Sequence, residues 1–344
     1  MKTLTKLTAL LLLAALLFSF AACTGTVVNG KEDPVQGATA TEKTPEQPNA
    51  PTEEPSFVEL ANRQRALLSE AFAAVSATPF ESCAEKVMSL APCDPGPLCF
   101  ITENNGNKGF VTAPSKLAVD GGKIYVNDIV ECPEGENSIF VYDMVSKTAS
   151  RVPCLTKTLG YNLMTVLNGK LYTTHSVEDL ATGDLTEFAG CINDDQEIYG
   201  TCILYSDHGS IRLFEGMDKA EQPWSGNSYC FTLDMQTNKW SNKQGAVTPE
   251  APFNYDWAAT VGFGQDGSFC VLAWPEANDD SFGTPYIARV DVDGNLLAYT
   301  KLPYTIDEFY AANVEPGICY APDGNIYLMV YSLDEVAVWR INLG

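Results

Sequence analysis

Carboxylate side chains gather in three polar segments of the chain, within 128–137, 215–228 and 275–284, and the second and third segments also contain an aromatic residue. Carboxylates accept hydrogen bonds and attract cations, and aromatic rings pack against apolar faces. Such segments suit calcium-assisted binding of a glycan or binding of a cationic peptide, and a solvated acidic surface is the plainer alternative. The candidate ligand-contacting residues are Glu131, Glu134, Glu221, Trp224, Glu276, Asp279, Asp280 and Phe282.

Residues suited to acid–base or nucleophilic catalysis are scarce. The two histidines are His175 and His208, so a zinc site built on histidine is nearly excluded. A Ser-His-Asp triad would need one of them, and no serine lies in a G-x-S-x-G segment. We therefore predict no metal site and assign no residue a catalytic role, while leaving open whether the protein is an enzyme and whether a divalent cation binds.

Two further motifs are better explained as turns. Residues 262–267 match G-x-G-x-x-G, but a strand follows where a dinucleotide site needs a helix. Asp291, Asp293 and Asn295 have the opening spacing of a calcium loop, yet Gly294 stands in the wrong place and no glutamate closes the loop. We expect a hairpin at each segment.

A glycine-containing turn followed by a short strand recurs five times after residue 98. The aligned glycines are Gly122, Gly169, Gly209, Gly267 and Gly324, and they are 47, 40, 58 and 57 residues apart. Asp-Gly, Asn-Gly and Gly-Gly pairs supply the positive φ angles of tight hairpins. The recurrence predicts five copies of one hairpin.

A second hairpin lies inside each interval, at Asp143–Lys147, Asp179–Gly183, Asp234–Asn238 and Asp291–Asn295. Two hairpins per repeat give four strands, and periods of 40 to 60 residues with four strands are typical of propeller blades. The fold class predicted is all-β, a propeller over 98–344 with five blades, or six by length. A multi-domain β-sandwich is the alternative.

The strands themselves agree with a propeller. Segments such as Phe269–Trp274 and Ile326–Tyr331 are nearly unbroken apolar runs, as expected for a sheet buried on both faces. The last repeat stops one strand early, and we expect Leu98–Thr102 to supply the missing outer strand and close the ring. The segment Ala321–Tyr327 also resembles repeats of the NHL and related bacterial propeller families, which implies the fold and no particular activity.

The first residues have the pattern of an export signal. Lys2 and Lys6 precede an apolar stretch of 16 residues, Leu7–Ala22, which is shorter than the roughly 20 that a membrane span needs. Ala21-Ala22-Cys23 resembles the lipobox of bacterial lipoproteins, although Phe20 departs from its usual leucine. The resemblance implies that 1–22 is a lipoprotein signal peptide and that Cys23 carries lipid; an ordinary secretory signal is the alternative.

Two further segments precede the propeller. Residues 23–55 are rich in Thr, Pro and Glu and contain no aromatic residue, which predicts a disordered tether. Residues 56–97 are predicted as a short helical neck, with a capping box at Ser56–Glu59 and a second helix from Thr78 to Leu90. We expect the neck to pack on the propeller.

Acidic residues dominate the predicted head. The whole chain has a formal charge of −23, and 33 of its 44 acidic but only 14 of its 21 basic residues lie in 98–344. Nucleic acid and anionic membrane surfaces are therefore poor partners for the head. Cations, basic peptides and neutral glycans are compatible with this charge.

Ten cysteines remain beside Cys23, and an even number in an exported chain permits disulfides. The pairs Cys132–Cys154, Cys191–Cys202 and Cys93–Cys99 are candidates. Cys202, Cys230 and Cys270 lie in apolar strands, where a free thiol acts as a small core residue. How the thiols pair is left open.

Together these features predict an exported monomer that is lipid-anchored at the outer face of a bacterial membrane. Its propeller would act as a non-catalytic ligand-binding or protein-interaction module, with a glycan or peptide as ligand. The alternative is a propeller-fold, metal-dependent hydrolase, lactonase or lyase acting on a carbohydrate-type substrate. A scaffold for an envelope complex is a third hypothesis.

Overall fold

The computed structural model describes residues 57–91, 101–104, 107–110, 116–127, 137–155, 163–190, 202–207, 209–215, 228–241, 244–246, 258–276, 283–304, 317–331 and 335–344. Contacts divide the chain into two units, Met1–Glu54 and Pro55–Gly344, and every described residue lies in the second. The predicted signal peptide, Cys23 and the tether lie outside the described residues.

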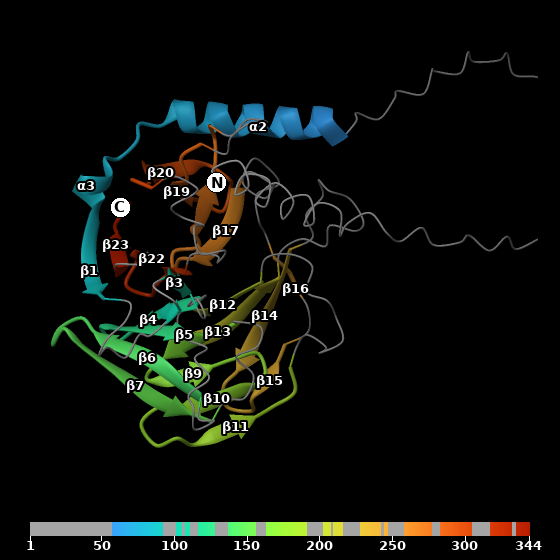
Figure 1. Cartoon of the computed structure of the whole chain (residues 1–344). Coiled ribbons are helices and arrows are strands. Elements are labelled where there is room, and N and C mark those ends of the chain that lie inside the picture. Colours follow the sequence, from blue (N-terminus) through green and yellow to red (C-terminus); the bar gives the residue numbers. More distant parts are fainter. Residues whose placement is uncertain are drawn as a thin grey trace, which may run out of the picture. The chain divides into compact units, whose positions relative to one another are not determined.

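Five antiparallel sheets of four strands form the second unit (Figure 1). The first blade is β4 (Lys116–Asp120), β5 (Lys123–Asn127), β6 (Asn137–Asp143) and β7 (Thr148–Cys154), and the second is β8 (Thr165–Leu167), β9 (Lys170–Tyr172), β10 (Ser176–Asp179) and β11 (Leu185–Glu187). The third is β12 (Cys202–Asp207), β13 (Ser210–Glu215), β14 (Ser228–Asp234) and β15 (Lys239–Trp240), with β16 (Gln244–Ala246) also paired to β14. The fourth is β17 (Ala258–Phe263), β18 (Phe269–Ala273), β19 (Tyr286–Val290) and β20 (Leu296–Lys301), and the fifth is β21 (Gly317–Tyr320), β22 (Ile326–Tyr331), β23 (Val336–Ile341) and β1 (Ala84–Leu90).

The first strands of the five blades form a closed circle. β4 contacts β8, β8 contacts β12, β12 contacts β17, β17 contacts β21, and β21 returns to β4. This is a five-bladed β-propeller, so the predicted fold class is confirmed and the blade number is five rather than six.

The repeated turns lie where the sequence places them, between the first and second strands of each blade. Asn168 and Gly169 of the second blade have φ angles of 52° and 73°, the left-handed region that glycine and asparagine enter most easily. The second set of hairpins joins the third strand to the fourth. Both sets are therefore part of the propeller repeat.

Apolar side chains fill four of the five junctions between blades. Ile124 and Tyr327 meet between the fifth and first blades, and Val141 and Val166 between the first and second. Further clusters join the second to the third blade and the fourth to the fifth. All five residues of β18 are buried, as its unbroken apolar sequence predicts for a sheet covered on both faces.

The junction of the third and fourth blades is built differently. Tyr205 on β12 stacks on Phe263 on β17, with ring centroids 4.9 Å apart. The apolar cluster on this face of the fourth blade consists of side chains of that blade and of the helix α2 (Phe57–Ala74). Leu68 and Phe72 of α2 are buried there, while Leu67 remains 40 % exposed.

The neck packs on the propeller as predicted. Phe72 meets the rings of Tyr286 and Tyr299 edge-on, with centroids 5.3 and 4.8 Å away, and α2 lies along β20 (Figure 1). The helix begins at Phe57, directly after the predicted cap residue Ser56. None of the helices in the described ranges is long and apolar enough to span a membrane.

The second predicted neck helix is largely wrong. Only α3 (Phe80–Cys83) is helical, and Ala84–Leu90 is the strand β1, which pairs with β23 along its whole length. Ala, Glu and Lys favour helices, but the open edge of β23 and the burial of Met88 (1 % exposed) outweigh that preference.

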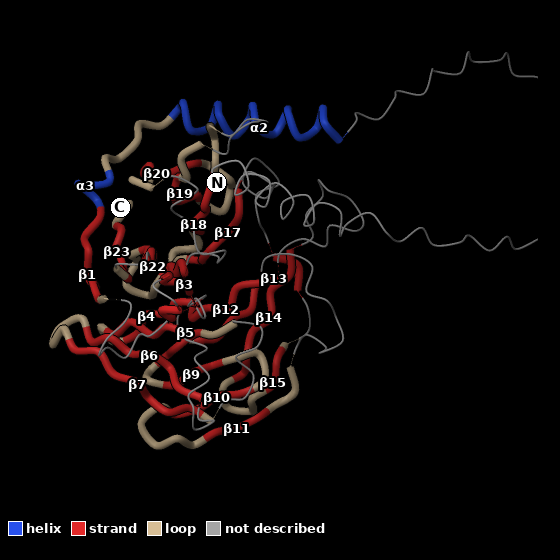
Figure 2. The backbone as a smooth tube through the Cα atoms, in the orientation of Figure 1, coloured by secondary structure: helices blue, strands red, loops and turns tan. Residues whose placement is uncertain are grey.

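The ring is therefore completed from the N-terminal side, as expected, but by a different segment. Residues 98–100 of the predicted strand lie outside the described residues, and its described end belongs to another sheet: β2 (Ile101–Asn104) pairs with β3 (Asn107–Phe110) in a separate hairpin. Figure 2 shows β1 beside β23, with α3 leading into it.

Candidate functional site

The two ends of the propeller differ in their connections. At one end, the turn face, the first strand of each blade joins the second through two to five residues, and in the first four blades the third joins the fourth through four or five. At the other end, the loop face, most connections from the second strand to the third and from blade to blade have nine or more residues. Alternating strand directions place all of these long connections on one face, where binding residues usually lie.

Most of the predicted ligand-contacting residues cannot be placed. Glu131, Glu134, Glu221, Trp224, Asp279, Asp280 and Phe282 lie outside the described residues. Glu276 is described, and it follows β18 at the loop face of the fourth blade.

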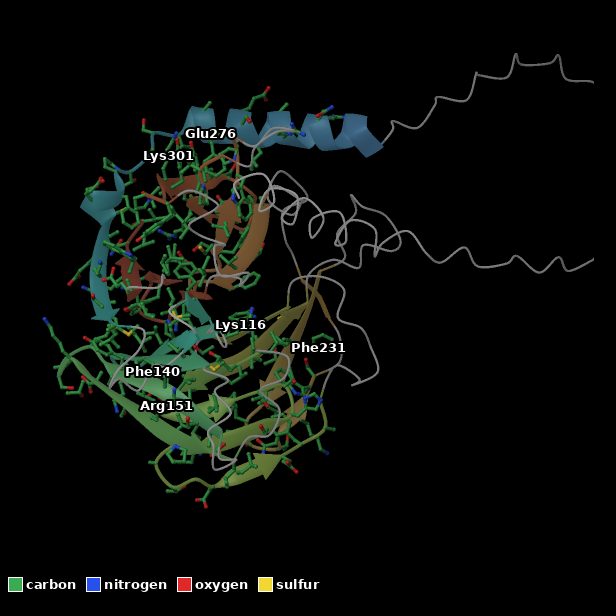
Figure 3. All side chains as sticks on the ribbon, viewed as in Figure 1. Lys116, Phe140, Arg151, Phe231, Glu276 and Lys301 are labelled. Carbon is green, nitrogen blue, oxygen red and sulfur yellow. The ribbon has the colours of Figure 1, made fainter. Side chains whose placement is uncertain are left out.

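Glu276 forms an ion pair with a lysine that the sequence analysis did not single out. Lys301 Nζ, on β20, donates to Glu276 Oε1 over 2.6 Å, and the Tyr286 hydroxyl on β19 donates to the same oxygen over 2.5 Å. Figure 3 shows the labelled Glu276 and Lys301 close together beside α2. Two strands and the segment after β18 thus contribute to one polar cluster, which we call the Glu276 cluster: Glu276, Tyr286 and Lys301.

Hydrogen bonds within the Glu276 cluster favour the charged forms of Glu276 and Lys301. The hydrogen bonds from Lys301 and Tyr286 lower the pKa of Glu276, and the hydrogen bond to Glu276 raises the pKa of Lys301. Burial, followed by the bond to Glu276, raises the pKa of Tyr286 to about 12. At neutral pH the cluster is a carboxylate, an ammonium and a neutral phenol.

A comparable pair lies on the neighbouring blade. Lys86 on β1 donates to Glu335 Oε1 and Oε2 over 2.8 and 3.1 Å, and Ser89 Oγ donates to Oε1 over 2.5 Å. Lys86 also lies over the Trp339 ring, 5.2 Å from its centroid, as Lys301 lies 4.8 Å from that of Tyr286. Only the pairing register of the outer strands could have revealed these lysines.

The loop-face turn of the second blade carries the one histidine that the structure describes. Thr174 Oγ1 and His175 Nδ1 are 2.6 Å apart, and the His175 carbonyl accepts from Phe188 N over 2.8 Å. A Cβ added to Gly190 would lie 2.3 Å from His175 Nε2, so a larger residue there would require the His175 ring to move. Trp240 of the third blade donates to the Thr174 carbonyl over 3.0 Å, which makes this turn part of a blade junction.

A buried carboxylate on the second blade escaped the sequence analysis. Glu178 is fully buried and accepts from Leu155 N over 2.8 Å. The pairing registers place Tyr142, Leu233 and Ile341 at the same position of other blades. Glu178 therefore satisfies the backbone where β7 ends, at a position that is apolar elsewhere.

The G-x-G-x-x-G match and the partial calcium-loop match both lie at hairpins, as predicted. Gly262 lies in β17, Gly264 and Gly267 lie in the turn that joins β17 to β18, and a Cβ on Gly262 would be 2.7 Å from Tyr320 Cβ. Asp291 Oδ1 accepts from the backbone of Asp293 and Asn295 over 2.9 and 2.8 Å. Asp143, Asp179 and Asp234 accept two turn N–H groups each in the same manner.

Within the described ranges, no group of three or more His, Cys, Asp or Glu side chains is arranged to hold a metal ion. Cys83, Cys154, Cys230, Cys270 and Cys319 are free thiols, so the candidate pairing of Cys132 with Cys154 is wrong. Burial, with a smaller effect of Glu178, raises the pKa of Cys154 to about 12. Such a thiol packs as a small apolar residue.

Comparison with known proteins finds two distant likenesses among solved structures. No protein-family model and no curated protein matches the chain. A luciferin-regenerating enzyme is 12 % identical with a TM-score of 0.34, over 67 % of this chain and 91 % of that one. The β-propeller domain of the Trilobed protease from Pyrococcus furiosus is 15 % identical with a TM-score of 0.29, over 67 % of this chain and 70 % of that one. The activities of these proteins are not carried to this chain.

Proposed function

We propose that the chain is a membrane-anchored envelope lipoprotein whose propeller binds a ligand at its loop face without transforming it. The observation that carries the proposal is the unequal distribution of connections: tight turns close one face, and long connections gather on the other. The blades and the neck supply a rigid support, which lowers the entropy lost when a ligand is bound.

The membrane anchor rests on the sequence around Cys23. The test is to express the full chain and its Cys23→Ser variant with a labelled fatty acid. We expect the wild type to carry label and to remain with membranes after a high-salt wash, and the variant to lose both properties. An unlabelled wild type that washes out of membranes would contradict the anchor without touching the binding proposal.

The binding face is tested by blocking each face separately. An azide-bearing amino acid replaces either Leu155, 60 % exposed at the loop-face end of β7, or Val145, 88 % exposed in the turn after β6. Both positions belong to the first blade, and each receives a polyethylene glycol chain. Pelleting of the full-length protein with delipidated cell-envelope material is then measured.

The chain attached at position 155 should prevent pelleting, and the chain attached at position 145 should leave it unchanged. The reverse pattern, or no pelleting of the unmodified protein, would refute the binding proposal. Envelope fragments recovered after incubation should be chemically unaltered. Reproducible cleavage by the purified protein would instead establish an enzyme.

A further inference from the structure

The two lysine–glutamate pairs of the loop face differ in whether the second carboxylate oxygen of the glutamate accepts a hydrogen bond. Glu335 uses both carboxylate oxygens, because Lys86 donates to each of them and Ser89 adds a second bond to Oε1. Glu276 receives Lys301 and Tyr286 on Oε1 alone. Its Oε2 accepts no hydrogen bond from any residue that the structure describes.

The Glu276 cluster also retains donor capacity. A lysine ammonium has three N–H donors, and Glu276 and Tyr286 account for at most two of those on Lys301. Both side chains of the pair are 49 % exposed. One open acceptor and one open donor therefore lie side by side at the surface.

Surrounding contacts hold this pair in place. Ser69 Oγ of α2 donates to the Pro275 carbonyl over 2.8 Å, directly before Glu276. On the other side, Gly283 lies so close to Glu276 that a Cβ added to the glycine would be 3.0 Å from Glu276 Cβ. Tyr286, whose hydroxyl orients the carboxylate, is stacked on Tyr299, with ring centroids 5.3 Å apart. Such a preorganised polar pair loses little entropy on binding.

Charge decides which ligand suits the pair. A cationic group drawn to Glu276 would meet the ammonium of Lys301, and an anionic group drawn to Lys301 would meet the carboxylate. Two adjacent hydroxyl groups avoid both conflicts, since one accepts from Lys301 Nζ while the other donates to Glu276 Oε2.

We propose that Glu276 and Lys301 together bind a vicinal diol of a neutral glycan at the loop face. This inference rests on the proposed binding function and narrows its ligand from glycan or peptide to a neutral polyhydroxylated chain. Glu335 and Lys86 form the matched pair that lacks the open oxygen, and they do not bind in this way.

The experiment measures migration of the full-length protein in native gels that contain dextran or mannan. The same polysaccharides after periodate oxidation and borohydride reduction, which destroy vicinal diols but keep the polymer soluble, serve as matched probes. Poly-lysine is the cationic probe. The proteins compared are the wild type, Glu276→Gln, Lys301→Gln and the control Glu335→Gln, each checked for an unchanged thermal midpoint.

We expect at least one intact polysaccharide to retard the wild type, and its oxidised form to have no effect. Glu276→Gln and Lys301→Gln should each weaken binding about tenfold, the effect of losing one charge-assisted hydrogen bond. Glu335→Gln should bind like the wild type. A variant with a lowered midpoint is compared at a temperature where it is fully folded.

Equal binding by Glu276→Gln and Glu335→Gln, retardation by the oxidised polymers, binding of poly-lysine alone, or no retardation at all would overturn the inference. These outcomes leave the proposed function standing if polyethylene glycol at position 155 still blocks pelleting with envelope material. If the unmodified protein does not pellet either, the proposed function fails as well.

Discussion

Gly262 shows how the glycine spacing of a ligand-binding motif can arise from close packing alone. The glycine lies where β17 meets the neighbouring blade, so an added Cβ would be 2.7 Å from Tyr320 Cβ and 2.9 Å from its backbone nitrogen. A side chain can turn away from such a contact, but backbone cannot. The G-x-G-x-x-G spacing therefore reflects a close approach of two blades.

Replacing Gly262 with alanine should lower the free energy of unfolding by about 2–3 kcal/mol, as expected for overpacking against backbone. Gly209→Ala is the control, because an added Cβ there meets nothing within 4 Å. Its φ of +79° should cost only about 1 kcal/mol. Urea denaturation gives both values, and equal costs would contradict the packing explanation.

The aspartates of the outer turns predict how stability depends on pH. Turn hydrogen bonds lower the pKa of Asp143, Asp234 and Asp291, chiefly from Ser146 N, Thr237 Oγ1 and the Asn295 side chain in turn. Since these pKa values are lower in the folded chain, the carboxylates stabilise it above the unfolded value of about 3.9. That contribution is lost as pH falls through the folded values.

Thermal midpoints should therefore change little between about pH 7 and 5 and fall below about pH 4. Asp291→Ala should lower the midpoint at pH 7 and flatten part of the acid decline. Asp293→Ala should leave both unchanged, because Asp293 enters the turn through its backbone N–H. A thermal midpoint that rises on acidification would show that folding does not lower the pKa values of these aspartates.

At this scale, sequence reasoning could find Glu276 but not its partners. An acidic residue after an apolar strand is visible in the chain, whereas Lys301 faces Tyr286 only through the register of β19 and β20. Glu178 was invisible for the same reason: its burial follows from the blade that covers it. Contacts between distant residues require the fold first.

Among the elements, α2 replaces part of a blade-to-blade contact. Phe72→Ala should destabilise the protein by about 3–5 kcal/mol, because it empties a buried site against Tyr286 and Tyr299. Leu67→Ala, on the same helix but 40 % exposed, should cost less than about 1 kcal/mol. Similar losses for both variants, measured by urea denaturation, would mean that α2 is not docked as described.

β1 illustrates the limit of local preference. The repeats correctly indicated that the fifth blade lacks an outer strand and that the N-terminal side supplies it. Local sequence could not choose between 84–90 and 98–102, because Ala84–Lys86 favour a helix and Leu98–Thr102 favour a strand. The outcome depends on which segment reaches the edge of β23.

A cross-strand disulfide tests this closure. Glu85 lies opposite Arg340 in the β1–β23 register, at the separation that a disulfide spans. Glu85→Cys with Arg340→Cys should form a bridge under mild oxidation, seen by mass spectrometry of non-reduced peptides. The bridge should raise the thermal midpoint. Thr102→Cys with Arg340→Cys should not pair, and efficient pairing of this second couple would contradict the described fifth blade.

For the whole molecule, the closed circle of blades produces two unlike faces. In the described ranges, the aspartates of the outer turns at the turn face accept hydrogen bonds from the turn backbone. The loop face receives the long connections and the two lysine–glutamate pairs of the fourth and fifth blades. The acidic head argues against polyanionic partners, and the neutral Glu276–Lys301 pair favours an uncharged ligand over a cationic one.

Hydrogen exchange of the full-length protein, with and without delipidated envelope material, tests the central claim most directly. We expect slower exchange of loop-face amides around 173–176 and 274–276, and unchanged exchange in the turns at 144–147 and 235–238. Protection confined to those turns, or retention of the protein with no change at either face, would contradict that claim.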